Sequence, residues 1–352
     1  MHLTIAMLTY RRNEYLAQVI PQLLEQVDDL SGPDATAGVL IVDNDPRAGA
    51  RAVVEAARAA LGSDPAESSE PLGEDVSAGS AVTSRLVYVH EPEPGIVAGR
   101  NRALSEARGS DALVFIDDDE IPSPGWLASL VSTWRAQDCA AVTGPTPPTF
   151  EVTPSPWVTA SGAFDSWEAA DGAQVRSADT GNLLLDLGVV ERLGLRFDPR
   201  YGLTGGEDSL FTRQLTRAGG VIRFAAGAVV TKRVPAARAR RTWVLERSLR
   251  SGSSWARVRI DTAGPADGGA SGRLARLRLR LGYGAKGLAK AGIDGARAGV
   301  ARIRGDVPAL ARYEVSSRGG LGMVVGALGV QVREYGRPRR RTSTARAGRR
   351  NA

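Results

Sequence analysis

Short apolar runs and segments of helical periodicity alternate along the first 120 residues. Residues 3–8, 39–42 and 112–116 are continuous apolar stretches typical of buried strands, and each ends abruptly at polar residues. Before and after the second of these runs, residues 15–27 and 51–61 place apolar side chains at helical spacing. A strand, a helix and a strand in this order predict a βαβ unit with a right-handed crossover, and hence a parallel sheet.

The alternation continues to residue 230 with two interruptions. We expect further strands and helices at 85–90, 101–108, 126–134, 140–144, 181–187, 208–218 and 221–230. Residues 62–84 hold five acids, no bases and many Ser, Gly and Pro, which predicts a flexible acidic insertion. Residues 145–171 are rich in Pro, Ser and Trp and predict a loop or lid.

The chain changes character after residue 235. Residues 237–259 predict a basic helix, and 261–272 predict a linker. Residues 273–281 (RLARLRLRL) fit the period of a strand and also align leucines on one helical face, so periodicity leaves both structures open. Residues 333–352 hold eight arginines and one acid, which predicts a disordered tail.

Charge divides the chain in the same way. The net charge is +6, but residues 1–230 carry 17 Lys/Arg against 32 Asp/Glu, whereas residues 231–352 carry 28 against 7. An acidic body with a basic attachment indicates contact with an anionic membrane or another polyanion. The apolar run 321–332 and the arginine tail are candidates for touching lipid, and a solvated helical extension is the alternative. Few aromatic residues lie among the arginines, so no nucleic acid is expected.

Residue usage excludes several classes of protein. Cys139 is the one cysteine, so no intramolecular disulfide can form, and we expect a cytoplasmic location, with peripheral attachment to the inner face of the membrane if the basic region binds lipid. Two histidines, His2 and His90, leave little room for a histidine-rich metal site or a Ser-His-Asp triad. No apolar stretch reaches the 18 residues of a membrane span, and the N-terminus lacks a signal core.

The aspartates that follow the strand at 112–116 are the first candidate site. The carboxyl ends of parallel strands bind ligands, and Asp117, Asp118 and Asp119 stand at such an end, with Asp43 at another. Adjacent carboxylates repel one another unless a cation compensates them, and oxygen ligands select Mg²⁺ or Mn²⁺. Such an ion binds substrate phosphates, which makes a diphosphate the expected partner. A solvated turn or a helix cap is the alternative.

Two further segments carry candidate chemistry. Glu207 and Asp208 follow glycines at the start of a predicted helix. A carboxylate at this position can accept a proton from a sugar hydroxyl. The alternative is that Asp208 or Ser209 caps the helix. Arg100, in the segment 95–104, can contact a nucleotide or its phosphates, or belong to a solvated helix start. Neither a Walker loop nor a dinucleotide fingerprint occurs, which argues against ATP hydrolysis and hydride transfer.

Taken together, these motifs resemble the inverting family 2 glycosyltransferases of the GT-A fold, and in particular the succinoglycan-type exopolysaccharide transferases. The resemblance follows the order TIAMLTYRRNEYL, VLIVDND, PGIVAGRNRAL, LVFIDDDEIPSPGWL, DTGNLLL, GEDSLFTRQLTRAGG and VP…R…W…R…RSGSS over about residues 1–260. It implies a mixed, mostly parallel sheet flanked by helices, with a catalytic domain at 1–235. From the change in charge and composition we expect a basic helical extension at 236–332 and the tail at 333–352, mostly outside the resemblance.

The resemblance also implies roles for individual residues. Thr9, Tyr10 and Arg11 would line the nucleotide pocket, Asp43 would bind the base, and Arg100 would hold the nucleotide. Asp117 and Asp119 would bind the metal ion, with Asp117 or Asp118 near the ribose. Residues 179–182 (DTGN) would face the donor sugar or the acceptor. Asp208 would be the general base, and Glu207 would assist the acceptor. Lys232 and Arg233 depart from the pattern, because relatives often carry a His or an acid before the Val-Pro step. In place of a third metal ligand, these cations would either contact the diphosphate or form a solvated strand end.

The function implied is metal-dependent, inverting transfer of a sugar from a UDP-, dTDP- or GDP-sugar to a hydroxyl of a glycan or lipid-linked acceptor, in the synthesis of a surface polysaccharide or glycolipid. Mg²⁺ or Mn²⁺ would be the cofactor, because the metal neutralises the diphosphate leaving group. Two alternatives remain open. One is a sugar nucleotidyltransferase, although the segment after the first strand lacks the glycines of a phosphate loop. The other is a non-catalytic, polybasic membrane adaptor.

Overall fold

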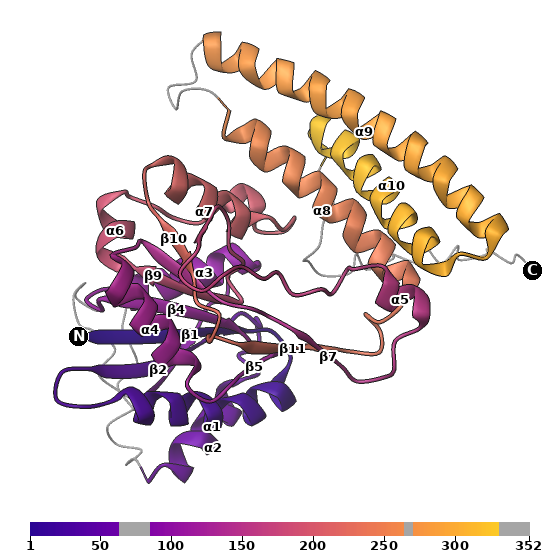
Figure 1. The fold of residues 1–352 in the computed structure, drawn as a ribbon. Coiled ribbons are helices and arrows are strands. Elements are labelled where there is room, and N and C mark those ends of the chain that lie inside the picture. Colours follow the sequence, from indigo (N-terminus) through magenta and orange to yellow (C-terminus); the bar gives the residue numbers. More distant parts are fainter. Residues whose placement is uncertain (63–84, 264–269, 331–352) are drawn as a thin grey trace, which may run out of the picture.

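The computed structural model describes residues 1–62, 85–263 and 270–330, so the arginine tail and nearly all of the predicted acidic insertion lie outside the described residues. An α/β body carries a group of three long helices on one side (Figure 1). These helices are α8 (Arg241–Asp261), α9 (Ala270–Arg304) and α10 (Val307–Ala327).

The apolar runs form the strands of an eight-stranded sheet with the order β3-β2-β1-β4-β9-β6-β10-β8. In chain order its strands are β1 (His2–Thr9), β2 (Thr36–Asp43), β3 (Leu86–His90), β4 (Ala112–Asp117), β6 (Ala141–Thr143), β8 (Gln174–Val175), β9 (Asn182–Asp186) and β10 (Ile222–Phe224). Strands β9 and β8 pair antiparallel with their neighbours, and the other adjacent strands pair in parallel. The sheet is therefore mixed and mostly parallel, as predicted.

Helices cover both faces of this sheet. One face packs against α1 (Asn13–Leu30), α2 (Arg51–Ala60) and α4 (Trp126–Gln137), and the other against α3 (Ile96–Glu106), α6 (Leu187–Arg192) and α7 (Glu207–Arg217). Because side chains alternate along a strand, Val114 of β4 packs in the hydrophobic core between the sheet and α1, α2 and α4. Its neighbour Phe115 packs in the core on the opposite face. Burial on both faces explains why these strands read as continuous apolar runs.

A small second sheet joins β5 (Glu120–Pro122), β11 (Val230–Val234) and β7 (Pro148–Phe150). The single strand expected at 221–230 is thus two strands, β10 and β11, in different sheets. The loop expected at 145–171 is also corrected, because it contains β7 and α5 (Pro156–Ala160). Trp157 and Val158 of α5 pack against Val244 of α8 and Ala311 of α10, which fastens this segment to the long helices.

Residues 273–281 are helical and form part of α9. Helix α10 packs against both α8 and α9, and glycines allow a close approach: a Cβ at Gly322 would lie 2.1 Å from the carbonyl oxygen of Leu249 in α8. The described part of the run predicted to touch lipid, 321–330, contributes to this packing, since Met323 is buried. None of the described helices has the length and apolarity needed to cross a membrane.

Candidate active site

Three neighbouring strands end at one edge of the large sheet, and the predicted site lies there. Strands β2, β1 and β4 are adjacent and parallel, with Thr9 opposite Asp43 and Leu8 opposite Asp117. Their carboxyl ends therefore meet, where ligands of open α/β sheets bind. The buried Thr9 hydroxyl donates a hydrogen bond of 3.0 Å to Asp118, which ties the end of β1 to the three aspartates.

Of the polar residues at the ends of β1 and β2, some are exposed at the surface and others are buried. Tyr10 is 45% exposed, and the Arg11 guanidinium lies over its ring and 3.3 Å from Asp45. Asp43 is fully buried, and its carboxylate accepts hydrogen bonds from the Tyr88 hydroxyl and from two backbone N–H groups of the turn before α2. Asp43 therefore holds this turn in place, and its contact with a nucleotide base stays a prediction.

The three aspartates after β4 are joined by a fourth acid. Carboxylate oxygens of Asp117, Asp119 and Glu120 lie within 4.8 Å of one another, and Asp119 and Glu120 are buried. Glu120 begins β5, and the predicted ligand set, which ended at Asp119, missed it. The contiguous DDDE sequence was the available signal. The structure thus brings the predicted Asp117 and Asp119 together and adds Glu120.

Lys232 and Arg233 make separate contacts from adjacent positions of β11. Lys232 lies opposite Glu120 in the antiparallel pairing of β11 with β5. Its ammonium is 2.7 Å from Glu120, 3.3 Å from Asp117 and 3.9 Å from Asp119. The Arg233 guanidinium instead lies over a tyrosine ring of α1, 5.0 Å from the ring centroid. Lys232 is therefore an ion-pair partner of the acidic cluster rather than a solvated strand end.

Two arginines complete the ion pairs of the cluster. Arg12 contacts Asp118 at 2.6 Å and Asp119 at 3.0 Å, and Arg238 contacts Asp119 at 2.9 Å. Sequence patterns missed both arginines, because they lie 106 and 119 positions from their acidic partners. Charge neutralisation explains how four adjacent acids remain at a buried strand end.

The acids of the cluster differ in the direction in which their surroundings shift the pKa. Burial raises the pKa of Asp118 to about 6, although Arg12 opposes the shift. Burial also raises the pKa of Glu120 to about 8, against the attraction of Lys232. For Asp117, attraction by Lys232 and nearby arginines outweighs the effect of burial and lowers the pKa.

The metal ion that the sequence predicts can be tested against these contacts. Three carboxylates within 4.8 Å suit a hard divalent ion in donor type and spacing. However, the Lys232 ammonium already contacts two of them at hydrogen-bond distance. A divalent ion about 4 Å from an ammonium would be repelled by roughly 8 kcal/mol at an effective dielectric of 20. The residues as they stand therefore do not fit a metal ion, which would have to displace the lysine.

Glu207 and Asp208 stand at the start of α7. Gly205 and Gly206 precede them with φ values of 72° and 88°, which only glycine adopts without strain. Gly206 is the N-cap, so neither Asp208 nor Ser209 occupies the capping position that the alternative interpretation assigned to them. Glu207 is buried in an ion pair with Arg100 of α3.

Asp208 has the environment expected of a proton acceptor. It is only partly exposed, and its carboxylate accepts a hydrogen bond from the backbone N–H of Ser209. Burial raises the pKa of Asp208, and repulsion by Glu207 and Asp179 raises it further. A general base works best when its pKa lies near the working pH, so a raised pKa suits this role.

The DTGN segment, residues 179–182, links the acidic cluster to Asp208. A Cβ at Gly181 would lie 2.5 Å from a carboxylate oxygen of Glu120, so only glycine permits this approach. Two residues away, Asp179 is close enough to raise the pKa of Asp208. The charge of Arg100 likewise acts on both groups, because it lowers the pKa of both Asp117 and Asp208. The two predicted acidic groups therefore influence each other's surroundings, and their joint role in one site stays a prediction.

Some polar atoms at this site lack partners within the described residues. The Thr180 hydroxyl and one carboxylate oxygen of Glu207 are buried without a hydrogen bond from any described residue. Buried polar atoms of this kind are rare and need an explanation, such as an absent ligand. Asn182 differs, because its side chain accepts a hydrogen bond from the Trp126 indole and donates one to the Ala228 carbonyl. Asn182 therefore has a structural role.

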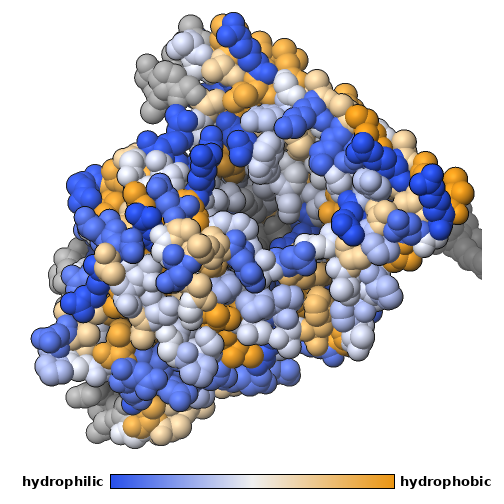
Figure 2. All heavy atoms as spheres, viewed as in Figure 1, coloured by the Kyte–Doolittle hydropathy of each residue, from blue (hydrophilic) through white to orange (hydrophobic). Residues whose placement is uncertain are grey.

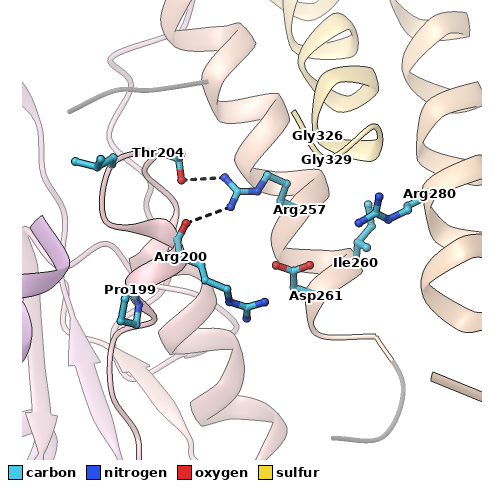
Figure 3. Close-up of a pocket in the computed structure, with 10 residues that line it drawn as sticks. Pro199, Arg200, Thr204, Arg257, Ile260, Asp261, Arg280, Gly326 and Gly329 are labelled. Carbon is cyan, nitrogen blue, oxygen red and sulfur yellow. Dashed lines mark hydrogen bonds between the residues drawn. The ribbon is translucent and has the colours of Figure 1, made fainter. Parts of the chain in front are cut away.

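A cavity of about 350 Å³ lies elsewhere, between the loop after the 3₁₀ helix η2 (Pro199–Tyr201) and the long helices. Arg257 of α8 crosses it and donates hydrogen bonds to the Thr204 hydroxyl at 2.8 Å and the Arg200 carbonyl at 3.5 Å (Figure 3). These contacts hold the loop that leads to Glu207 against α8. Figure 2 shows a hollow between the α/β body and the long helices on the face in view.

Comparison with known proteins places the chain among sugar transferases. Residues 4–166 match the family described as Glycosyl transferase family 2. The succinoglycan biosynthesis protein ExoM of Rhizobium meliloti (strain 1021) is 31% identical over 264 residues, which cover 75% of this chain and 77% of that protein.

Two solved structures give weaker matches. Staphylococcus aureus TarS aligns with a TM-score of 0.46 and 13% identity over 74% of this chain and 43% of TarS. GalNAc-T7 with UDP, GalNAc and Mn²⁺ aligns with a TM-score of 0.49 and 11% identity over 78% of this chain and 53% of that chain. This chain thus spans about half the length of these two structures.

Proposed function

The chain belongs to glycosyltransferase family 2, and from this membership we propose that it transfers a sugar with inversion from a nucleotide-diphosphate donor to a hydroxyl of a glycan or lipid-linked acceptor. The observation that carries the proposal is that Gly181 packs directly against Glu120 of the acidic cluster, while Asp179, two residues before it, and Arg100 both act electrostatically on Asp208. The succinoglycan role in the name of the relative ExoM supports surface polysaccharide or glycolipid as the product class.

In this reaction Asp208 takes the proton of the acceptor hydroxyl as its oxygen attacks the anomeric carbon. The bond between that carbon and the β-phosphate oxygen breaks, and its electron pair stays on the diphosphate. Attack opposite the leaving group inverts the anomeric carbon. The unpartnered oxygen of Glu207 is placed to hold the acceptor, because it is buried beside Asp208 without a described partner.

The donor nucleotide is assigned to the edge formed by β1, β2 and β4. Exposed Tyr10 and Arg11 offer a ring and a guanidinium at the surface, above buried Thr9. An exposed aromatic ring and a guanidinium suit the nucleotides of UDP-, dTDP- and GDP-sugars alike. Mg²⁺ or Mn²⁺ is the cofactor that the sequence predicts, but the Lys232 ammonium already contacts Asp117 and Glu120, so no step of the transfer is assigned to a metal ion. The catalytic domain is assigned to residues 1–235 and the helical extension to 236–332.

We place the extension on an anionic membrane surface. Helix α9 carries nine Lys/Arg and one acid, and exposed apolar side chains line it: Leu274, Leu277, Leu281, Leu288 and Ile303. Their spacing puts these five side chains within one face of the helix. A lipid-linked acceptor would then reach the site from the membrane that α9 contacts.

Turnover of a panel of nucleotide sugars tests the function. Purified protein is incubated with UDP-, dTDP- and GDP-sugars, with and without lipid-linked acceptors, and release of the nucleoside diphosphate is measured. One preferred donor should release its nucleoside diphosphate slowly, by hydrolysis, when it is alone, and rapidly, by sugar transfer, when the acceptor is present. Synthesis of a nucleotide sugar from a sugar phosphate, or no turnover of any donor, would contradict the proposal.

A further inference from the structure

Lys232 occupies the position that a metal ion would take among the carboxylates. Strand pairing fixes it there, because β11 and β5 place it directly opposite Glu120. Its ammonium lies within hydrogen-bond distance of Glu120 at 2.7 Å and of Asp117 at 3.3 Å. On the other side of the cluster, Arg12 and Arg238 contact Asp119. The cluster is thus already supplied with positive charge by the chain itself.

The side chain that carries the ammonium is partly exposed. The side chains of Lys232 and Asp117 are each 34% exposed, whereas those of Asp119 and Glu120 are 4% and 1% exposed. Two N–H groups of the ammonium point to Glu120 and Asp117, and 3.9 Å to Asp119 is too long for a hydrogen bond. The third N–H is therefore available, among the described residues, to a ligand at the exposed side.

We propose that Lys232 is a catalytic residue of the sugar transfer and takes the place of a divalent metal at the donor diphosphate. This inference rests on the proposed function and adds the identity of the cation. As the bond from the anomeric carbon to the β-phosphate oxygen breaks, the electron pair stays on that oxygen. The third N–H of Lys232 donates a hydrogen bond to the diphosphate that carries this charge, while Glu120 and Asp117 hold the ammonium in position. The proton of the acceptor goes to Asp208.

Metal and nucleotide binding test the inference without any turnover. Mn²⁺ binding is measured by electron paramagnetic resonance, and UDP binding by calorimetry in EDTA. The wild-type protein should bind no Mn²⁺ at micromolar concentration and should bind UDP in EDTA. Lys232→Gln should weaken UDP binding about tenfold or more, since it removes a charged hydrogen bond. Arg233→Gln, on the same strand, should change UDP affinity less than threefold, roughly, because its contact is with a ring outside the cluster.

A charge reversal gives the complementary result. Lys232→Glu adds a carboxylate to the cluster and removes the ammonium, so this variant should bind Mn²⁺ and require it for UDP binding. If a variant fails to fold, the double variant Lys232→Gln with Glu120→Gln keeps the buried pair neutral and should show the same loss of UDP affinity. Once a donor is known, wild-type turnover should survive EDTA.

Three outcomes would overturn the inference. These are micromolar Mn²⁺ binding by the wild-type protein, loss of its UDP binding in EDTA, and unchanged UDP affinity in the folded Lys232→Gln variant. Each is independent of the proposed function, because sugar transfer can be demonstrated while the cation proves to be a metal. Conversely, absence of sugar transfer with every donor refutes the proposed function. In that case the UDP-binding measurements still decide whether Lys232 is a diphosphate ligand.

Discussion

Asp208 is the residue on which the transfer chemistry depends most directly. Replacement by Asn keeps the shape and removes the proton acceptor, so Asp208→Asn should lower kcat about 10²–10⁴-fold. Donor affinity should stay nearly unchanged, because the donor nucleotide is assigned to the ends of β1, β2 and β4, whereas Asp208 lies at the start of α7. Steady-state nucleotide release and calorimetric donor binding measure the two quantities. Glu106→Gln, at the far end of α3, is the control, and equal kcat for both variants would refute the assignment.

The pH dependence of kcat should report the environment of the same carboxylate. Only the charged form accepts a proton, so kcat should fall as pH drops through a pKa that burial, Glu207 and Asp179 raise above the ordinary value of about 4. Asp179→Asn removes one repelling charge and should move this acid limb to lower pH. Asp171→Asn, another exposed acid of this region, should leave the limb in place. If the acid limb of the kcat–pH profile does not move in Asp179→Asn, the group whose titration controls kcat is not Asp208.

The candidate site residues predicted from the sequence are those whose motifs span only a few neighbouring positions. Runs such as DDD after a buried strand and GED before a helix are visible within a few positions of the sequence. Glu120 belonged to the same run and was missed, because its inclusion depends on the pairing of β5 with β11. Arg12 and Arg238 could not be found from the sequence, since contacts over more than 100 positions follow from the tertiary fold.

At the scale of elements, sequence predicted most of the strands and helices that cover the sheet. Continuous apolar runs identify strands buried on both faces, and these need only local information. The antiparallel position of β9 between β4 and β6 was not visible, because strand order depends on long-range pairing. Residues 273–281 are helical and belong to the first turns of α9, which periodicity alone could not decide.

Close packing of α8 and α10 gives an element-scale prediction. A methyl group at Gly322 would lie 2.1 Å from a backbone carbonyl of α8, so Gly322→Ala should force the helices apart and cost about 1–3 kcal/mol. Gly292→Ala in α9 meets no atom within 4 Å and should instead stabilise by about 0.5–1 kcal/mol, since Ala favours a helix. Thermal melting measures both. Equal melting temperatures of the two variants would show that α8 and α10 do not pack this closely.

At the scale of the whole molecule, charge and hydrophobicity separate the two parts of the chain. The α/β body is acidic, whereas α9 is basic and exposes apolar side chains along one face. Hydrophobic and hydrophilic surface alternate along the outer edge of the long helices (Figure 2). A basic helix with leucines on the outside and a glycine-packed inner side suits contact with an anionic lipid surface, while an acidic body suits solvent.

Vesicle binding tests this arrangement. The protein should sediment with vesicles that contain phosphatidylserine more than with phosphatidylcholine alone, and salt should weaken binding because it screens the arginines. Leu281 and Leu288 are 68% and 61% exposed, and burying such a side chain in lipid contributes about 1.5–3 kcal/mol. Each Leu→Ser change should therefore weaken binding about tenfold or more. Val152→Ser removes an equally apolar exposed side chain from the body and should have no effect. If all three variants bind alike, charge alone draws the protein to the vesicle and α9 does not insert its leucines.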